Sequence, residues 1–449
     1  MTNGPLLGHT WVTQKRTHNP VVNAQIIESQ KELKQMITSK AQKVLGAVDK
    51  EALLDIAQEL IKVPSFKTQE TEMARYLGNY FEQRGYEVEL QEVEEGRYQT
   101  IATLKGSGHG KSLMFNGHID INPLAQNWKR DPWTPTIDGD RLYGAGIRNM
   151  KGGVAAMIEA AEAIRRSEVE LKGDLVLACV VGELQGGVGT SYLCEHGPLA
   201  DMAIVPEPFG ANNIVTVHAG SAEMAIHTIG RARHMNRMEE SIDAIEKMCK
   251  AIPIIKGIEF SHRPRPDLPG LPRVNVGTII GGLGRDYDRS EATYISDFCT
   301  VVVDIRFPPG TTANSIKKDV ERALDGIKKE DPDFQYEIEM PPPAKYQAFT
   351  MIVEPLDLPK GEYILDSIVR QFRTVVGKEP AGVGTVLPWS YASDDTSKLF
   401  KAGVPCLLHG PAGGIESATV PDEYSVISDM HQVAKVLALT AHDVCSLAK

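Results

Sequence analysis

Histidine and carboxylate side chains follow three short apolar segments of this sequence. The motif FNGHID contains His118 and Asp120, VVGELQGG contains Glu183, and VPEP contains Glu207. Imidazole and carboxylate groups accept and release protons, and they also bind metal ions. Because open α/β sheets bind ligands beyond the carboxyl ends of their strands, we expect these four residues to converge on one site.

The segments that must position these residues alternate between strand-like and helical patterns. Short apolar runs separated by amphipathic helices are typical of a mostly parallel sheet with both faces covered. We therefore predict an α/β fold. The strands and helices expected in its first part cover residues 49–63, 70–85, 87–92, 100–104, 112–117, 151–166, 174–182 and 202–208.

The pattern changes after residue 218. Two strand–helix units follow, which predict a small α+β domain inserted into the larger one, and the α/β pattern then resumes with the core strand VPCLLHGP. We predict four segments: an N-terminal extension at 1–45, the first part of the main domain at 46–218, the inserted domain at 219–342, and the second part of the main domain at 343–449.

Composition excludes several classes of function. The 449 residues include 48 basic and 59 acidic side chains, and the formal charge of −11 disfavours nucleic acid as a partner. The six cysteines form no C-x-x-C pair, which is typical of free thiols in a reducing compartment. No apolar run approaches the roughly 18 residues that span a bilayer, and the N-terminus lacks the apolar stretch of a signal peptide. We expect a cytoplasmic protein that binds neither nucleic acid nor membrane.

The glycine-rich segment GSGHGKS at 106–112 departs from a phosphate-binding loop. Only three residues separate Gly106 from Gly110, where such a loop has four. The segment also leads into a strand-like run, whereas a phosphate-binding loop leads into a helix. We predict a hairpin turn at this position.

The polar motifs occur in an order that resembles the M20 metallopeptidase/aminoacylase family. GHID is followed by YGAGIRNMKGG, GELQGGVGT, PEP, GRARH, HGPAGG and VPDEY, over about residues 50–440. The family includes acetylornithine deacetylase, succinyl-diaminopimelate desuccinylase and carboxypeptidase G. The resemblance implies a zinc-peptidase-like catalytic domain that holds two zinc ions and an inserted lid domain that usually dimerises. It also implies hydrolysis of amide bonds in N-acyl amino acids, peptides and related carboxylates.

The resemblance implies roles for the residues at the strand ends. His118 matches a metal-binding histidine, and Asp120 matches the aspartate that orients it. Glu183 matches the general base, and Glu207 matches a metal-binding carboxylate. We predict these four as catalytic residues together with Asn149, which stands in the NMKGG segment where the family has aspartate.

Further matches lie in the inserted domain and near the C-terminus. His234 matches the lid histidine that reaches the partner subunit's active site and stabilises the oxyanion, and we count it as catalytic. Arg306 matches the arginine that holds a substrate carboxylate. Together with Arg306, we predict His409, Thr419 and Asp395 as substrate-binding residues.

Three of the five metal-ligand positions are substituted. The aspartate that bridges both metals is Asn149 here, the second glutamate of the family's Glu-Glu pair is Leu184, and the C-terminal histidine falls at Thr419 or Ala418. Zinc needs at least three nitrogen, sulfur or carboxylate ligands, and a two-metal site needs a shared carboxylate. We therefore expect no tight binuclear centre.

Two of the family's ligands remain and could keep a single ion. His118 and Glu207 could bind one zinc or manganese ion weakly, and His409, Asp394 or Asp395 could serve as a replacement ligand. Without a metal, water keeps a pKa of about 15.7 instead of the value of about 7 for zinc-bound water. Hydrolysis without a metal would then need an activated substrate.

These observations lead to one predicted function and two alternatives. We predict an M20-type hydrolase that cleaves an amide-like C–N bond in a small anionic, carboxylate-bearing substrate, with Glu183 as general base and a homodimer formed through the lid. A metal-independent lyase, decarboxylase or isomerase on the same scaffold is the first alternative, because proton transfer by Glu183 would serve those reactions. A non-catalytic homologue is the second, and it leaves the retained base unexplained.

Overall fold

The computed structural model describes residues 39–449 apart from residue 290 and the segments 348–350 and 413–420. The predicted substrate-binding residue Thr419 therefore lies outside the described residues. Contacts within the chain group Val44–Lys449 into one compact unit. In the described part of the chain, no helix combines the length and the apolar character needed to cross a membrane.

An eight-stranded sheet carries the three apolar segments that precede the predicted site residues. Its strand order is β1-β2-β6-β3-β7-β17-β8-β16. The central strands run parallel: β6 (Leu175–Val180), β3 (Leu113–His118), β7 (Met202–Val205) and β17 (Cys406–Leu408). All residues of β3 and β6 are buried, as expected for a sheet covered on both faces. The predicted α/β fold with a mostly parallel sheet is confirmed.

The edges of this sheet are formed by shorter or antiparallel strands. On one side, β1 (Glu87–Glu94) pairs with β2 (Arg97–Leu104), and on the other β8 (Asn213–Val215) pairs with β16 (Gly382–Gly384). The hairpin predicted at 106–112 is wrong, because β6 lies between β2 and β3 in the sheet. The N–H groups of Ser107 and His109 donate instead to the carbonyls of Leu171 and Lys172.

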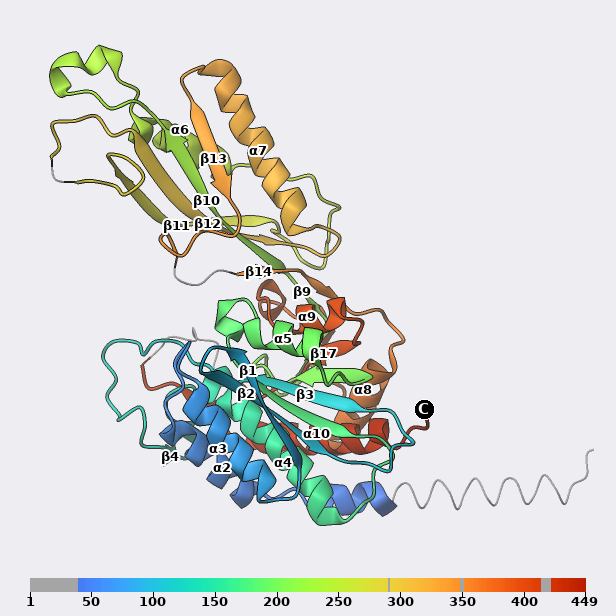
Figure 1. Ribbon diagram of the computed structural model, residues 1–449. Coiled ribbons are helices and arrows are strands. Elements are labelled where there is room, and N and C mark those ends of the chain that lie inside the picture. Colours follow the sequence, from blue (N-terminus) through green and yellow to red (C-terminus); the bar gives the residue numbers. More distant parts are fainter. Residues whose placement is uncertain (1–38, 290, 348–350, 413–420) are drawn as a thin grey trace, which may run out of the picture. The chain divides into compact units, whose positions relative to one another are not determined.

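Helices cover both faces of the sheet (Figure 1). One side carries α2 (Lys50–Lys62), α3 (Thr71–Glu82), α4 (Gly152–Ser167) and α10 (Ile427–Cys445), and the other carries α5 (Val188–His196) and α9 (Thr396–Lys401). The helix α8 (Tyr363–Val376) packs on α10 and β17. Helix α2 begins where the Asp49 carboxylate accepts two backbone N–H groups, and it ends just before Pro64, as its sequence predicts.

A second, antiparallel sheet lies between the two parts of the main domain in the sequence. Its order is β11-β12-β10-β13, with β14 also paired to β10. Its elements are β10 (Gly220–Ile229), α6 (Ala244–Lys256), β11 (Arg273–Gly282), β12 (Phe298–Phe307), α7 (Ala313–Glu330), β13 (Gln335–Glu339) and β14 (Ile352–Val353). Both helices bury apolar side chains against this sheet in one cluster. Strand β14 pairs with this sheet although it lies beyond residue 342, the predicted end of the inserted domain. The domain boundaries stay a prediction.

Two small sheets complete the described structure. One joins β4 (Thr136–Asp138), β5 (Arg141–Tyr143) and β18 (Tyr424–Val426). The other pairs β9 (Val217–His218) with β15 (Leu356–Asp357). Since β9 directly precedes β10, it carries the chain from the main sheet into the inserted one.

Candidate functional site

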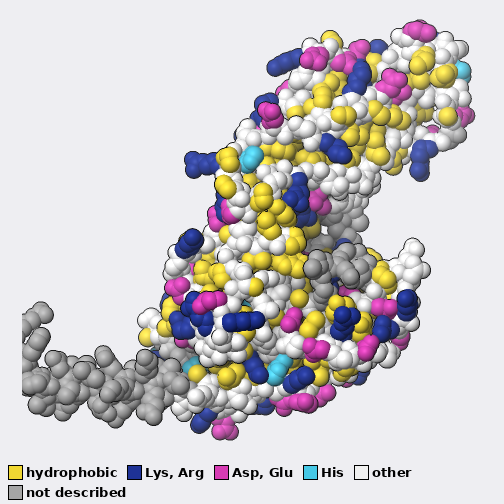
Figure 2. Space-filling view, turned by 180° about the vertical axis from the view of Figure 1, so that it is seen from behind, with side chains coloured by type: hydrophobic (Ala, Val, Ile, Leu, Met, Phe, Trp, Pro, Cys, Tyr) yellow, Lys and Arg dark blue, Asp and Glu magenta, His cyan; other side chains and the backbone are white. Residues whose placement is uncertain are grey.

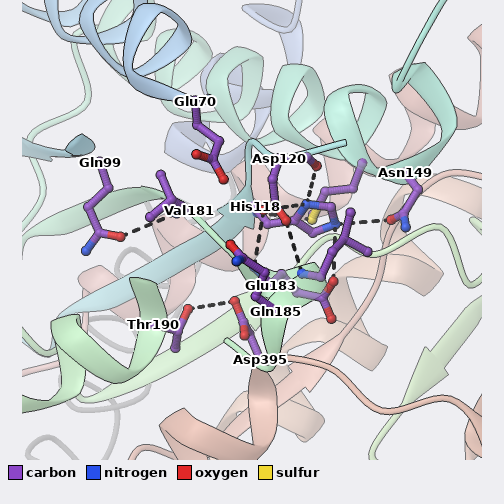
Figure 3. Close-up of polar contacts among 12 residues, drawn as sticks. Glu70, Gln99, His118, Asp120, Asn149, Val181, Glu183, Gln185, Thr190 and Asp395 are labelled. Carbon is purple, nitrogen blue, oxygen red and sulfur yellow. Dashed lines mark hydrogen bonds and ion pairs between the residues drawn. The ribbon is translucent and has the colours of Figure 1, made fainter. Parts of the chain in front are cut away.

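The residues predicted from the strand ends lie close together. His118 is the last residue of β3, Glu183 begins a 3-10 turn after β6, and Glu207 follows β7. Because these three strands are parallel neighbours, their carboxyl ends meet at one edge of the sheet. Figure 3 shows His118 between Asp120, Asn149 and Glu183.

The imidazole of His118 is buried and surrounded by oxygen atoms. Its Nε2 lies 3.2 Å from Asn149 Oδ1, 3.4 Å from Glu207 Oε1 and 3.9 Å from Glu183 Oε2. Its Nδ1 lies 2.8 Å from the backbone oxygen of Asp120. Burial alone would lower the pKa of His118, but its bonds to Asp120 and Glu207 outweigh burial and raise the pKa well above its usual range.

Asp120 connects the end of β3 to the turn after β6. Its carboxylate accepts the backbone N–H groups of Glu183 at 3.2 Å and Leu184 at 3.1 Å, and its Oδ1 lies 3.4 Å from His118 Nδ1. Burial would raise the pKa of Asp120, but the bond to His118 and the two N–H donors lower it. One ionised carboxylate thus orients both the imidazole and the turn that carries Glu183.

Glu183 and Glu207 have fewer donors than Asp120. Burial raises the pKa of Glu183 well above its usual range, and the charges of Glu207 and Asp395 add to this effect. Burial likewise raises the pKa of Glu207, although its bond to His118 opposes the rise. Raised pKa values of this kind suit general acid–base work.

A buried arginine supports the Glu183 turn from behind. Arg97 Nη2 donates to Gln185 Oε1 at 2.6 Å, and Arg97 Nε donates to Glu70 Oε2 at 3.0 Å. Gly182 adopts a φ of 69°, and a Cβ at this position would lie 2.9 Å from Arg97 Nη2. A side chain at position 182 would therefore displace the guanidinium that holds the turn.

A cavity of about 500 Å³ opens beside this cluster. It is lined by Asn122, Asn149, Glu183, Leu184, Glu207, Phe209, Arg306, Met351, Tyr391, Ala392, Ser393 and Asp394. Arg306 comes from β12 of the inserted sheet, where its Nε pairs with Asp304 at 2.9 Å and its Nη1 donates to Ser393 Oγ at 2.8 Å. A guanidinium and three carboxylates therefore share this cavity.

Of the three predicted substrate-binding residues that the structure describes, only Arg306 lines the cavity. The His409 side chain is turned toward Phe372 of α8 and the carbonyl of Asn213, and burial lowers its pKa to about 4. Asp395 is buried behind the cavity, where it accepts a hydrogen bond from Thr190 at 2.7 Å and burial raises its pKa to about 7. Neither side chain reaches the lining, because each already packs against its own partner within the fold.

His234 also lies apart from the cavity in this single chain. It is exposed at the start of the segment Met235–Glu240 of the inserted domain, and its Nδ1 accepts the N–H of Asn236. Its ring meets Tyr294 edge-on at 5.4 Å between centroids. Its predicted role requires a second subunit and stays a prediction.

The sequence reasoning missed several residues of the cavity lining. Phe209 follows the PEP motif directly and lies parallel to the ring of Trp389, 5.7 Å away between centroids. Asn122 comes two residues after Asp120, so extending each motif along the chain would have found both. Tyr391 comes from a segment without such a motif, and no signal in the sequence marks it.

The site's residues fall within a known family. The model of the family described as "Peptidase family M20/M25/M40" matches residues 114–443 of this chain. The chain belongs to the M20 peptidase family. As a member of this family it is a hydrolase, and the predicted family and enzyme class are confirmed.

Similar proteins cover almost the whole of this M20 family member. An N-formyl-4-amino-5-aminomethyl-2-methylpyrimidine deformylase of Halalkalibacterium halodurans is 29% identical over 440 residues, 92% of this chain and 99% of that protein. An acetylornithine deacetylase of Proteus mirabilis is 27% identical over 414 residues, 88% of this chain and 97% of that protein. The solved structure of an M20 family metallo-carboxypeptidase from Sulfolobus solfataricus has a TM-score of 0.69 at 18% identity, covering 88% of this chain and 99% of that one.

One group of donor atoms among the described residues could hold a metal ion. Within the described ranges, His118, Glu183 and Glu207 bring ligand atoms within 4.8 Å of one another. A catalytic zinc ion uses three protein ligands, but Glu183 is also the predicted general base, which leaves His118 and Glu207 as the ligands. Asn149 supplies only a neutral amide where a bridging carboxylate is needed, and Leu184 supplies no donor. The replacement ligands expected at His409, Asp394 and Asp395 are not part of the described ligand group.

Proposed function

We propose that this protein hydrolyses the amide bond of a small N-acyl compound that carries a carboxylate, with Glu183 as the general base. One observation carries the proposal: Glu183 lies 3.9 Å from His118 Nε2 and lines the same cavity as Arg306. The relatives described above are named as a deformylase and a deacetylase, which supports a short acyl group such as formyl or acetyl.

Each side chain of the site has a separate role in the proposed reaction. The carboxylate of Glu183 takes a proton from water as the water oxygen bonds to the acyl carbon, and it passes this proton to the nitrogen as the C–N bond breaks. Arg306 binds the substrate carboxylate through its guanidinium N–H groups. Asp120 keeps His118 and the Glu183 turn in place.

We propose that the site binds at most one metal ion tightly. His118 and Glu207 would hold this ion, which would supply Lewis-acid polarisation of the acyl oxygen. The neutral amide of Asn149 and the aliphatic side chain of Leu184 argue against a second ion. Metal analysis of the purified protein should find no more than one ion per chain, and two tightly bound ions would refute this proposal.

We also propose a homodimer formed through the inserted domain. No other described strand pairs with the outer side of its edge strand β11, and the Ile279 side chain of this strand is 53% exposed. Ile245 and Ile254 of α6 are exposed too, and Figure 2 shows hydrophobic side chains gathered on this upper part of the molecule. Exposed apolar surface beside a free strand edge favours pairing with another chain. His234 would then approach the cavity of the partner subunit.

The proposed reaction can be tested on a panel of N-formyl and N-acetyl amino acids. Amine and carboxylic acid should appear in equal amounts, and Glu183→Gln should reduce turnover by about 10²–10⁴-fold. Glu87→Gln, which changes an exposed carboxylate of β1, should leave turnover unchanged. Unchanged activity in Glu183→Gln would remove the general base from the proposal. Release of carbon dioxide or of an unsaturated product would replace hydrolysis with decarboxylation or elimination.

A further inference from the structure

A buried chain of three side chains leads from the cavity wall to β9. His218, Thr396 and Asp394 are each exposed by no more than 3%. The Thr396 hydroxyl donates to Asp394 Oδ1 at 2.6 Å, and the Thr396 backbone N–H donates to the same oxygen at 2.8 Å. On the other side, His218 Nε2 lies 2.9 Å from the Thr396 hydroxyl, and Nδ1 lies 2.8 Å from the carbonyl oxygen of Ala219.

The hydrogens in this chain can be counted from the chemistry of each group. A backbone carbonyl only accepts, so His218 Nδ1 must carry a hydrogen. The Thr396 hydroxyl has one hydrogen and gives it to the Asp394 carboxylate, so it can only accept from His218 Nε2. With Asp394 ionised, both ring nitrogens of His218 must therefore carry a hydrogen, and the ring is an imidazolium.

The second oxygen of Asp394 faces the same imidazole. Asp394 Oδ2 is buried without a hydrogen-bond partner among the described residues, and it lies 3.6 Å from His218 Nε2. A buried carboxylate oxygen without a donor is costly unless a positive charge lies nearby. An imidazolium at His218 supplies that charge at ion-pair distance.

We propose that His218 is a positioning residue of the cavity, a buried imidazolium that fixes and neutralises Asp394 through Thr396. Asp394 lines the cavity next to Ser393, which accepts the hydrogen bond of Arg306. Because the positive charge of His218 balances the carboxylate of Asp394, Asp394 adds no net negative charge to the cavity wall that an anionic substrate approaches. The effect on substrate binding rests on the proposed function, whereas the protonation of His218 does not.

The protonation can be tested without any substrate. Nitrogen NMR of the full chain labelled with ¹⁵N-histidine at neutral pH should show that both ring nitrogens of His218 carry a hydrogen. The His218→Gln variant assigns the signals, because they disappear from its spectrum. One protonated and one bare ring nitrogen at His218 would overturn the proposal, even if no amide substrate is found.

The positioning role can be tested by substituting Thr396, which lies between His218 and Asp394. Thr396→Val removes the hydroxyl and should raise KM for an anionic substrate roughly tenfold, the size expected for one unbalanced charge near a partly buried site, with a smaller change in kcat. Thr396→Ser keeps the hydroxyl and should restore KM. His218→Gln should raise KM like Thr396→Val. If KM is unchanged in His218→Gln and Thr396→Val although turnover is measurable, the positioning role is refuted.

A matched control lies in the inserted domain. His227 is fully buried, with Nδ1 2.7 Å from the hydroxyl of Thr300 and Nε2 2.9 Å from a carboxylate oxygen of Glu339. Like His218, it contacts a threonine hydroxyl and a carboxylate, but its carboxylate partner Glu339 does not line the described cavity, whereas Asp394 does. His227→Gln should leave KM unchanged, and a KM change equal to that of His218→Gln would show that the effect of His218→Gln comes from general loss of packing.

Discussion

Arg97→Met removes a buried charge that supports the candidate site from behind. The guanidinium of Arg97 lies 2.5 Å from a carboxylate oxygen of Glu70, and the Glu70 side chain is fully buried. Taking away one partner of a buried ion pair costs about 3–5 kcal/mol, because the other charge remains without compensation. Methionine keeps most of the apolar length of arginine, so the loss reports on the charge and its donors. We expect a decrease of about 3 kcal/mol in the free energy of unfolding at pH 8.

The pH dependence of this variant follows from Glu70. Burial raises the pKa of Glu70 above its usual range even though Arg97 opposes the rise. Without Arg97 the pKa rises further, so Glu70 takes up a proton more readily as the pH falls. A protonated carboxyl needs no counter-charge, and the destabilisation should therefore be smaller at pH 5 than at pH 8.

Urea denaturation of four proteins measures the coupling between the two side chains. Wild type, Arg97→Met, Glu70→Met and the double variant form a cycle, and the double variant should recover about 2 kcal/mol because a buried ion pair can be replaced by apolar residues at little cost. Arg237→Met is the control, since Arg237 and Glu240 form an exposed pair worth less than about 1 kcal/mol. A loss below about 1 kcal/mol in Arg97→Met, or strict additivity in the double variant, would refute this reasoning.

Three further predictions concern the inserted domain, the metal site and stability. Ile279→Lys places a charge on the free edge of β11 and should give a monomer in light scattering, while a persisting dimer would locate the interface elsewhere. Asn149→Asp combined with Leu184→Glu and Thr419→His should raise the number of zinc ions bound per chain, and unchanged metal content would contradict the assigned ligand positions. Burial raises the pKa of Glu159 to about 7, so its contribution to stability is full below pH 4.5 and is lost as the pH rises toward 7. In urea denaturation, the free energy of unfolding of Glu159→Gln relative to that of wild type should therefore increase by about 2 kcal/mol from pH 5 to pH 8. The same difference from wild type at both pH values would contradict the raised pKa.

Local patterns in the sequence were sufficient to predict the central elements of the fold. The apolar run at 174–182 contains all of β6 and the run at 112–117 contains β3 up to its last residue, because a fully buried parallel strand requires continuous apolar residues. His118, Glu183 and Glu207 come together for the same reason, since the residues that end neighbouring parallel strands share one edge of the sheet. This part of the site depends only on strand order and on motif position.

The rest of the site depends on contacts between distant residues. Arg97 and Gln185 are 88 positions apart, and Arg306 and Ser393 are 87 positions apart, so no local pattern relates them. The place of His409 beside the GPAGG motif predicts a position at the site. At the end of β17, however, its ring points away from the cavity toward Phe372 and the carbonyl of Asn213. Side-chain direction reverses with each residue of a strand, and proximity along the chain does not fix it.

The distribution of hydrogen-bond donors explains why proton transfer is assigned to Glu183. Each of the buried carboxylates Asp120 and Glu70 has dedicated partners: Asp120 has His118 and two backbone N–H groups, and Glu70 has the guanidinium of Arg97. Glu183 and Glu207 both lie near the Nε2 atom of His118, and both line the cavity. The pKa of Asp120 is lowered, so it stays ionised and positions other groups, whereas the raised pKa values of Glu183 and Glu207 favour uptake of a proton. The capacity to move protons therefore lies with Glu183 and Glu207, two of the three carboxylates that line the cavity.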